Sequence, residues 1–372
     1  EGSKVYNGKN GVSFNNTMYA SISDTYINAV GSGSYGIRHK GEVDNYSLNV
    51  KNCEVNAFVP VLVRNMTGTG YNLTLEGANS LTANSTNIYQ IVLSNTDYDG
   101  TQALAEPTGS YTVTGAENFN VYPISTTLNV SSSEQLSAAI SAGYAVELTQ
   151  DITTGIDFSA ESTDINLGGN TLTLTSSNHK VGGNISVKEG TVNVEKGYFD
   201  VRPSTTNSTQ VFEGVVFENN VLKKTNGTST NHVISAFESC PVVADAVMKY
   251  TFKNCTFENA NAVFEAMSGY GVCTIEAVFE NCTFNLFGNS SAIDIVNYIT
   301  ANITIKSCTF NITATSSSVG IIDSMSGSTV NVTFEGTNVL NGTAAVATDS
   351  SVAGTVDEVR IHGIPAVKVK AT

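Results

Sequence analysis

The chain has 372 residues, with 18 Lys and Arg against 33 Asp and Glu, so its formal net charge is -15. This acidic balance argues against nucleic acid and anionic membrane surfaces as partners and favours cations or basic partners. No apolar run approaches the roughly 18 residues that a membrane-spanning helix needs, so we expect no membrane-spanning segment.

The first third of the chain carries a cysteine-containing unit and a basic position beside it. Residues 50–55 read Val-Lys-Asn-Cys-Glu-Val, and Arg64 opens the segment Arg-Asn-Met-Thr-Gly that follows. Arg38 precedes Arg64, and Ser94 follows it, each by close to one repeat length. If these spacings mark successive turns of a repeat, one column of this segment is basic or neutral, and Arg38 and Arg64 are candidate ligand-binding residues.

A boundary between two segments is expected near residues 122–133, where a Ser/Thr-rich stretch leads into a helix at 131–143. Ser131 and Glu134 fit a capping box, and Gly143 suits the helix end. A strand at 145–148 follows immediately. Helix then strand predicts a second solenoid whose open end the helix covers; the alternative is an ordinary amphipathic crossover helix. The predicted segments are 1–125 and 126–372.

The second segment repeats a short unit that sets its register. Residues 252–257 (Phe-Lys-Asn-Cys-Thr-Phe) return at 279–284 and 305–310, with degenerate copies at 212–214 and 334–336. Repeats of this length, made only of short strands and turns, indicate a solenoid, because no single unit can bury its apolar face alone. We therefore predict an all-β parallel β-helix of about 26 residues per coil.

The cysteines of the repeat occupy the same site on successive coils, at Cys255, Cys282 and Cys308. Cysteine packs well as a small buried hydrophobe, so we expect a column of buried thiols. Neighbouring coils could bring two thiols near disulfide range, although stacked strands often misalign the side-chain vectors. A zinc site is not expected, because the chain has no Cys-x2-Cys pair and its four histidines are scattered.

A carboxylate also recurs once per repeat through the second segment; its positions are Glu238, Glu265, Asp294, Asp323 and Asp349. Period-2 alternation places these acids on the outward face. A second column serves as an internal control, because its signs alternate from coil to coil; its positions are Glu213, Lys253, Glu280, Lys306 and Glu335. Like charges on adjacent rungs repel, so the first column is a candidate functional feature.

Three interpretations of the carboxylate column stay open. The acids are hydrated residues that keep a sheet face soluble, or they bind calcium or another cation between rungs, or they hydrolyse glycosidic bonds. In the third case Glu265, Asp294 and Asp323 are the catalytic candidates, and one acid must be kept protonated by its like-charged neighbour. No Lys, Arg or His stands beside them, which favours a non-enzymatic role.

The recurring units resemble those of the right-handed parallel β-helix superfamily, often called pectin-lyase-like. This superfamily includes polysaccharide lyases and hydrolases, phage tailspikes and surface adhesins. The resemblance implies a right-handed solenoid over most of the chain, but the Phe-x-Asn-Cys-x-Phe units reflect coil stacking and select no chemistry. Tyr270 and Tyr298 follow Glu265 and Asp294 at similar offsets and are candidates for stacking on sugar rings.

These observations predict a secreted or cell-surface protein with a structural or adhesive role, whose leader peptide has already been removed. It would bind polysaccharide or self-associate end to end, with the basic column of one copy meeting the acidic column of another. The ligand-binding candidates are Glu238, Asp349, Tyr270, Tyr298, Arg38 and Arg64. No cofactor is expected, although calcium fits the acids. The alternative is a polysaccharide-degrading hydrolase or lyase that uses Glu265, Asp294 and Asp323.

Overall fold

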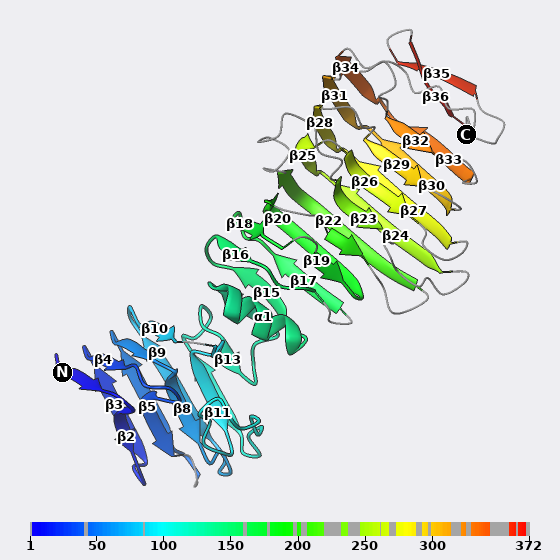
Figure 1. Cartoon of the computed structure of the whole chain (residues 1–372). Coiled ribbons are helices and arrows are strands. Elements are labelled where there is room, and N and C mark those ends of the chain that lie inside the picture. Colours follow the sequence, from blue (N-terminus) through cyan, green and yellow to red (C-terminus); the bar gives the residue numbers. More distant parts are fainter. Residues whose placement is uncertain are drawn as a thin grey trace. The chain divides into compact units, whose positions relative to one another are not determined.

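The computed structural model contains two compact units built almost entirely of short parallel strands (Figure 1). The first unit comprises residues 1–130 and 134–139, and the second comprises residues 131–133 and 140–372. The structure describes residues 2–40, 44–84, 86–158, 162–176, 179–195, 199–201, 207–218, 232–236, 246–260, 262–267, 273–287, 292–296, 299–313, 321–324, 329–342, 357–361 and 364–369.

The first unit is a three-sided parallel solenoid. Its sheets have the strand orders β1-β4-β7-β10, β13-β11-β8-β5-β2 and β12-β9-β6-β3, so each side gains one strand per coil. The strands are β1 (Lys4–Asn7), β2 (Asn10–Phe14), β3 (Tyr19–Ser23), β4 (Tyr26–Ala29), β5 (Tyr35–Lys40), β6 (Ser47–Lys51), β7 (Glu54–Ala57), β8 (Val59–Arg64), β9 (Tyr71–Glu76), β10 (Ser80–Ala83), β11 (Ile91–Ser94), β12 (Tyr111–Thr114) and β13 (Val121–Tyr122). The predicted parallel solenoid is confirmed here.

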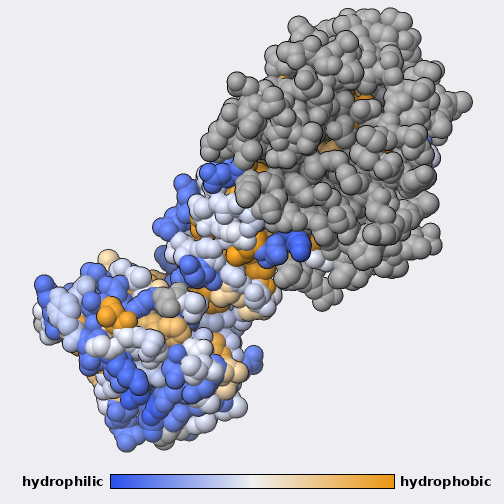
Figure 2. Space-filling view, in the orientation of Figure 1, coloured by the Kyte–Doolittle hydropathy of each residue, from blue (hydrophilic) through white to orange (hydrophobic). Residues whose placement is uncertain are grey.

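The core of this unit consists of aliphatic residues stacked in register. Ile37, Val61 and Ile91 pair across three successive coils, and all three are fully buried. Each such burial stabilises the fold by about 1.5–3 kcal/mol relative to an exposed side chain. The visible surface of the unit is mainly hydrophilic, with isolated apolar residues (Figure 2). Period-2 alternation thus separates the core from the solvent face on every side.

The one helix of the described chain, α1 (Ser133–Ser141), lies within the predicted range 131–143 and follows β14 (Thr127–Val130). Leu136, Ala139 and Ile140 are buried, as their helical spacing predicts. The helix is followed by Gly143, whose φ of 78° is favourable only for glycine and a few polar residues. Residues 134–139 group with the first unit, and the residues on either side group with the second.

The second unit continues the same parallel pattern over a longer stack. One sheet follows the order β15-β17-β20-β22-β24-β27-β30-β33, with β16, β18, β25, β28, β31 and β34 paired beside it, and a second runs β19-β21-β23-β26-β29-β32. The strands are β15 (Ala145–Leu148), β16 (Ile152–Thr154), β17 (Ser162–Asn166), β18 (Thr171–Leu174), β19 (His179–Val181), β20 (Asn184–Val194), β21 (Phe199–Val201), β22 (Asn207–Glu218), β23 (His232–Ala236), β24 (Val247–Lys253), β25 (Thr256–Ala260), β26 (Ala262–Met267), β27 (Cys273–Glu280), β28 (Thr283–Phe287), β29 (Ile293–Val296), β30 (Ile299–Lys306), β31 (Thr309–Thr313), β32 (Ile322–Ser324), β33 (Thr329–Glu335) and β34 (Val339–Gly342).

Stacked phenylalanines explain the recurring Phe-x-Asn-Cys-x-Phe unit. The rings of Phe252 and Phe279 lie 4.7 Å apart and within 5° of parallel. In the neighbouring column, Phe284 stacks on Phe310 at 4.4 Å and 10°. Equivalent positions on adjacent rungs share one backbone geometry, so their rings take the same orientation and pack face to face. The core of the second unit therefore contains columns of stacked aromatic rings beside its aliphatic residues, whereas that of the first is largely aliphatic.

The Asn-Cys pair of the repeat forms the corner between two strands. Asn254 and Asn281 have φ values of 53°, in the left-handed region that asparagine tolerates. The following thiols are buried and free, as predicted, and each lies close to a main-chain carbonyl of the preceding rung. Cys282 Sγ, for example, lies 3.4 Å from the Phe252 oxygen. The thiols thus lie within weak hydrogen-bonding distance of main-chain carbonyls of the preceding rung.

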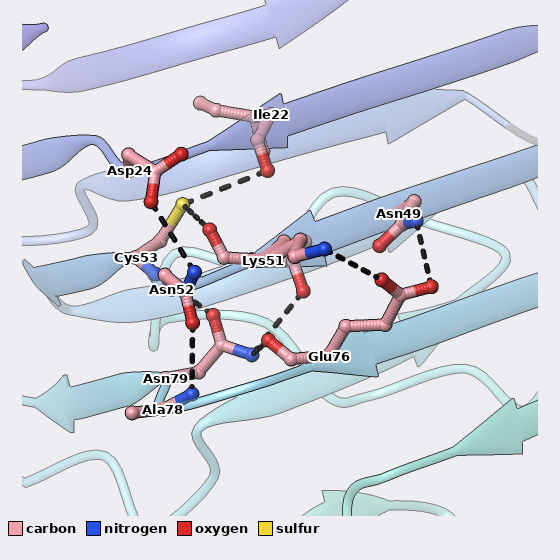
Figure 3. A network of polar contacts seen from close by, with 10 residues as sticks. Ile22, Asp24, Asn49, Lys51, Asn52, Cys53, Glu76, Ala78 and Asn79 are labelled. Carbon is pink, nitrogen blue, oxygen red and sulfur yellow. Dashed lines mark hydrogen bonds and ion pairs between the residues drawn. The ribbon is translucent and has the colours of Figure 1, made fainter. Parts of the chain in front are cut away.

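Asparagine side chains join successive corners, as Figure 3 shows around Cys53. Asn79 Oδ1 accepts the Cys53 amide at 2.9 Å, and Asn79 Nδ2 donates to the carbonyls of Val50 and Glu76 at 3.2 and 3.0 Å. Asn338 repeats this pattern in the second unit, where it accepts the Cys308 amide at 2.7 Å. At these two corners, one asparagine therefore satisfies main-chain groups of two rungs at once.

Beyond the parallel stack, β35 (Asp357–Ile361) and β36 (Ile364–Val369) form an antiparallel pair. Their pairing departs from the repeat, and β36 lies against β33. The antiparallel pairing of these strands shows that they do not add a further coil to the parallel stack.

Replacing Asn79 by alanine removes three cross-corner hydrogen bonds and leaves partly buried main-chain groups without partners. We expect the free energy of unfolding to fall by about 1–3 kcal/mol. Urea unfolding of the full chain measures this change, with Ser13→Ala as the control because Ser13 is exposed. Equal losses in the two variants would show that the corner asparagine has no special role.

Candidate functional site

The backbone register brings three of the predicted acids together. Glu265 on β26 pairs with Asp294 on β29, and Asp294 pairs with Asp323 on β32. Their neighbours Phe264, Ile293 and Ile322 are buried, in keeping with the expected alternation. On β23 the position opposite Glu265 is held by Ser235, so the register does not continue to Glu238. Glu238, Asp349, Tyr270 and Tyr298 lie outside the described residues.

The control column has the alternating pairing that the sequence predicts. Glu213, Lys253, Glu280, Lys306 and Glu335 occupy successive register positions on five strands. Lys253 lies 3.2 Å from Glu213, and Lys306 lies 3.0 Å from Glu280. Each pair is half exposed and contributes little stability by itself. The column shows how outward charges on stacked rungs neutralise one another.

The strands β30 and β33 carry Lys306 and Glu335 at their ends. A row of uncharged polar residues precedes these charges on both strands. Each strand contains Thr-x-Asn-x-Thr, and the pairs Thr300–Thr329, Asn302–Asn331 and Thr304–Thr333 are in register. We call these six residues the threonine-asparagine face. Asn331 Nδ2 donates to Asn302 Oδ1 at 2.9 Å. Within the described part of the chain, the four threonine hydroxyls have no protein partner. All six side chains are at least partly exposed.

In the first unit, the structure changes the expected alignment of the basic column. Ser94 pairs with Arg64, as predicted, but the residue opposite Arg64 on β5 is Lys40. Arg38 lies opposite Leu62 instead. The coil that joins Lys40 to Arg64 is shorter than the expected repeat, so the alignment moves from Arg38 to Lys40. Arg38 and Arg64 therefore lie on neighbouring strands but not at the same register position.

A segment that the sequence analysis did not single out packs against the strands that carry Arg38 and Arg64. Residues 95–110, here called the strap, connect β11 to β12, and Asp97 of the strap forms an ion pair with Arg64. A Cβ at Gly33 would lie 2.8 Å from that of Asp99, so the strap packs directly on the turn before β5. Leu62 and Val92 are fully buried. Two features of the sequence could have drawn attention to the strap: the length of this connection and its Asp-Tyr-Asp-Gly sequence at 97–100.

Charged groups of the strap and of β5 and β8 surround the Tyr35 hydroxyl. Burial is the main cause that raises the pKa of Tyr35, and Asp97 and Asp99 raise it further, whereas Arg38 and Arg64 lower it. The Arg38 guanidinium carbon lies 5.5 Å from the centre of the Tyr35 ring. Tyr35, Arg38, Arg64, Asp97 and Asp99 form what we call the strap cluster. The cluster brings two cations, two anions and a phenol together.

Among the side chains that the structure describes, His39 of the first unit and His179 of the second are buried. His39 Nε2 lies 2.7 Å from the Thr17 carbonyl, which can only accept, so Nε2 carries the proton and Nδ1 accepts from the Tyr71 hydroxyl at 2.8 Å. His179 Nδ1 donates to the Ile156 carbonyl, and its Nε2 accepts the Ser176 amide. Burial lowers the pKa of both histidines below the ordinary value. These imidazoles serve as hydrogen-bonding parts of the core.

Comparison of the chain with protein-family models, curated proteins and solved structures finds no match. The parallel β-solenoid therefore rests on the structure itself, and the narrower resemblance stays a prediction. Among the described residues, no group of three or more His, Cys, Asp or Glu side chains is arranged to hold a metal ion. In the same ranges, no helix has the length and apolarity to cross a membrane.

We expect the folded chain to lose stability as the pH is lowered, because His39 and His179 take up protons more readily in the unfolded chain. Because the folded pKa lies below the unfolded value of about 6.5, the unfolded chain takes up protons first as the pH falls. The contribution of the two histidines to the free energy of unfolding is fully present above about pH 7.5. It decreases below about pH 6.5, by at most roughly 1.4 kcal/mol per pH unit for each histidine.

Urea unfolding between pH 7.5 and pH 5.5 measures this dependence. His39→Gln keeps an amide that can donate to the Thr17 carbonyl but does not titrate, so its stability should fall less steeply over this range. The same slope in the variant and in the original chain would contradict the assignment.

Proposed function

We propose that the chain is an extracellular structural or adhesive solenoid that binds polysaccharide through its flat polar side. The observation that carries the proposal is the threonine-asparagine face, where two consecutive rungs present the same three polar residues in register. A polysaccharide is itself periodic, so a surface that repeats at fixed intervals can contact several sugar units in the same way.

The chemistry of this face suits sugar hydroxyls. Threonine hydroxyls and asparagine amides both donate and accept hydrogen bonds, and neither adds charge. Rungs are separated by about 4.8 Å and alternate residues along a strand by about 6.7 Å, so the six side chains form a planar grid. Threonine is also stiff about χ1, which limits the entropy lost when a ligand binds. Weak contacts of this kind gain strength when many rungs or many copies bind together.

The rest of the second unit supports a structural role. On its longer sheet, outward charges neutralise each other from rung to rung, as Lys249 does with Glu276 at 3.2 Å. Asparagine columns add further links between coils: Asn311 donates to Asn285 at 2.7 Å, and Asn341 donates to Asn311 at 2.9 Å. A stack joined in this way resists bending, which a spacer or an adhesive stalk requires.

Self-association is a second form of the same proposal. The acids of β26, β29 and β32 would then face basic residues of another copy. Because Arg64 already pairs with Asp97 in its own chain, Arg38 is the better basic candidate for such a contact.

Replacing Thr304 and Thr333 by valine removes two hydroxyls from the face while the side-chain shape is kept. We expect binding to an insoluble neutral polysaccharide to weaken by roughly fivefold or more, since each hydrogen bond contributes about 0.5–1.5 kcal/mol and two are lost. Co-sedimentation of the full chain measures this change. Thr112→Val is the matched control, because Thr112 is an exposed strand threonine in the first unit. Equal binding by both variants would rule out the threonine-asparagine face.

A second candidate function rests on the register of Glu265, Asp294 and Asp323. Positions one rung apart approach the roughly 5–5.5 Å carboxyl separation of retaining glycosidases, and positions two rungs apart approach the roughly 6.5–9.5 Å of inverting ones. If the chain is such an enzyme, it releases reducing ends from a polysaccharide and Asp294→Asn abolishes that release. Glu276→Gln, on the other sheet of the unit, should keep it. Absence of turnover in the original chain would exclude this function.

A further inference from the structure

Unpaired buried polar atoms gather at the strap cluster. Eight side-chain nitrogen or oxygen atoms in the described parts of the chain are buried without a hydrogen-bond partner, and three of them belong to Arg38, Arg64 and Asp97. Each such atom costs free energy, so natural structures contain few of them and each requires an explanation.

We propose that the strap cluster of the first unit binds a neutral saccharide. The three unpaired atoms of the cluster are two donors, the Nε atoms of Arg38 and Arg64, and one acceptor, Oδ1 of Asp97. A sugar presents neighbouring hydroxyls that can accept from the donors and donate to the acceptor. An acidic ligand would satisfy the arginines but would be repelled by Asp97 and Asp99, so a neutral ligand fits this arrangement better.

The side chains of the cluster are accessible enough to meet such a ligand. The side chain of Asp97 is 38% exposed and that of Arg64 20% exposed. Arg38 is also only partly buried, and within the described residues it forms no ion pair. Small rotations of these side chains would turn their unpaired atoms toward a bound molecule. The Arg64–Asp97 pair and the packing of the strap keep these side chains beside one another before the ligand arrives, which limits the entropy cost of binding.

This inference rests on the proposed function in taking a saccharide as ligand, but it concerns a different unit and a different chemistry. The threonine-asparagine face is uncharged and repeats from rung to rung, as a polymer requires. The strap cluster is a single charged site, so it recognises a short saccharide or a chain end. Variants in one site therefore leave the other intact, and each proposal can fail independently.

Isothermal titration calorimetry of the full chain tests the site with uncharged glucose and N-acetylglucosamine hexamers and with an acidic hexamer of galacturonate. We expect binding to a neutral hexamer, and a weakening of about tenfold or more in Arg38→Gln, because hydrogen bonds from charged groups are the stronger ones. Tyr35→Phe, which removes only the hydroxyl, should weaken binding by a smaller factor. Thr112→Val, at an exposed threonine of the same unit outside the cluster, should bind the hexamer normally.

Tyr6→Phe is the matched control for the tyrosine change, since Tyr6 is an exposed tyrosine of the same unit. Thermal unfolding of each variant shows whether it is folded. The inference is overturned if no neutral hexamer binds, if only the acidic hexamer binds, or if folded Arg38→Gln binds as tightly as the original chain. These outcomes leave the threonine-asparagine face and its co-sedimentation test unaffected.

Discussion

The structure of each unit depends on stacking parallel strands in register. Once a coil is fixed, each residue lies about 4.8 Å from its counterpart in the next coil, so every position is repeated as a column. Apolar columns become the core, as Phe252 and Phe279 show with parallel rings 4.7 Å apart. Polar side chains in a column must form hydrogen bonds with one another or with water. The identity of one residue in a coil is therefore constrained by its counterparts above and below it.

This constraint separates structural columns from candidate functional ones. Glu280 and Lys306 neutralise each other, and Asn79 joins the main chains of two rungs; such columns maintain the stack. The threonine hydroxyls of β30 and β33 and the unpaired atoms of the strap cluster have no such use within the described chain. Functional sites are expected where a column or cluster keeps hydrogen-bonding capacity that the fold does not use.

Much of this arrangement can be predicted from the sequence, because the repeat unit marks the register directly. The Phe and Cys positions identify the stacked rungs, and they place Glu265, Asp294 and Asp323 on adjacent strands. The prediction was wrong for Arg38, because an average repeat length does not account for the short coil that pairs Lys40 with Arg64. The ion pair between Asp97 and Arg64 could not be predicted from the sequence. Asp97 lies in the strap, which does not follow the repeat, so only the folded structure shows which residue it contacts.

The most direct test of the account is the salt dependence of polysaccharide binding by the full chain. A contact made by hydroxyls and amides should be nearly independent of ionic strength between about 0.05 M and about 1 M, because uncharged groups are not screened. The account predicts that co-sedimentation with a neutral polysaccharide stays constant over this range. Loss of binding at high salt would contradict it and would show that the charged columns make the contact instead.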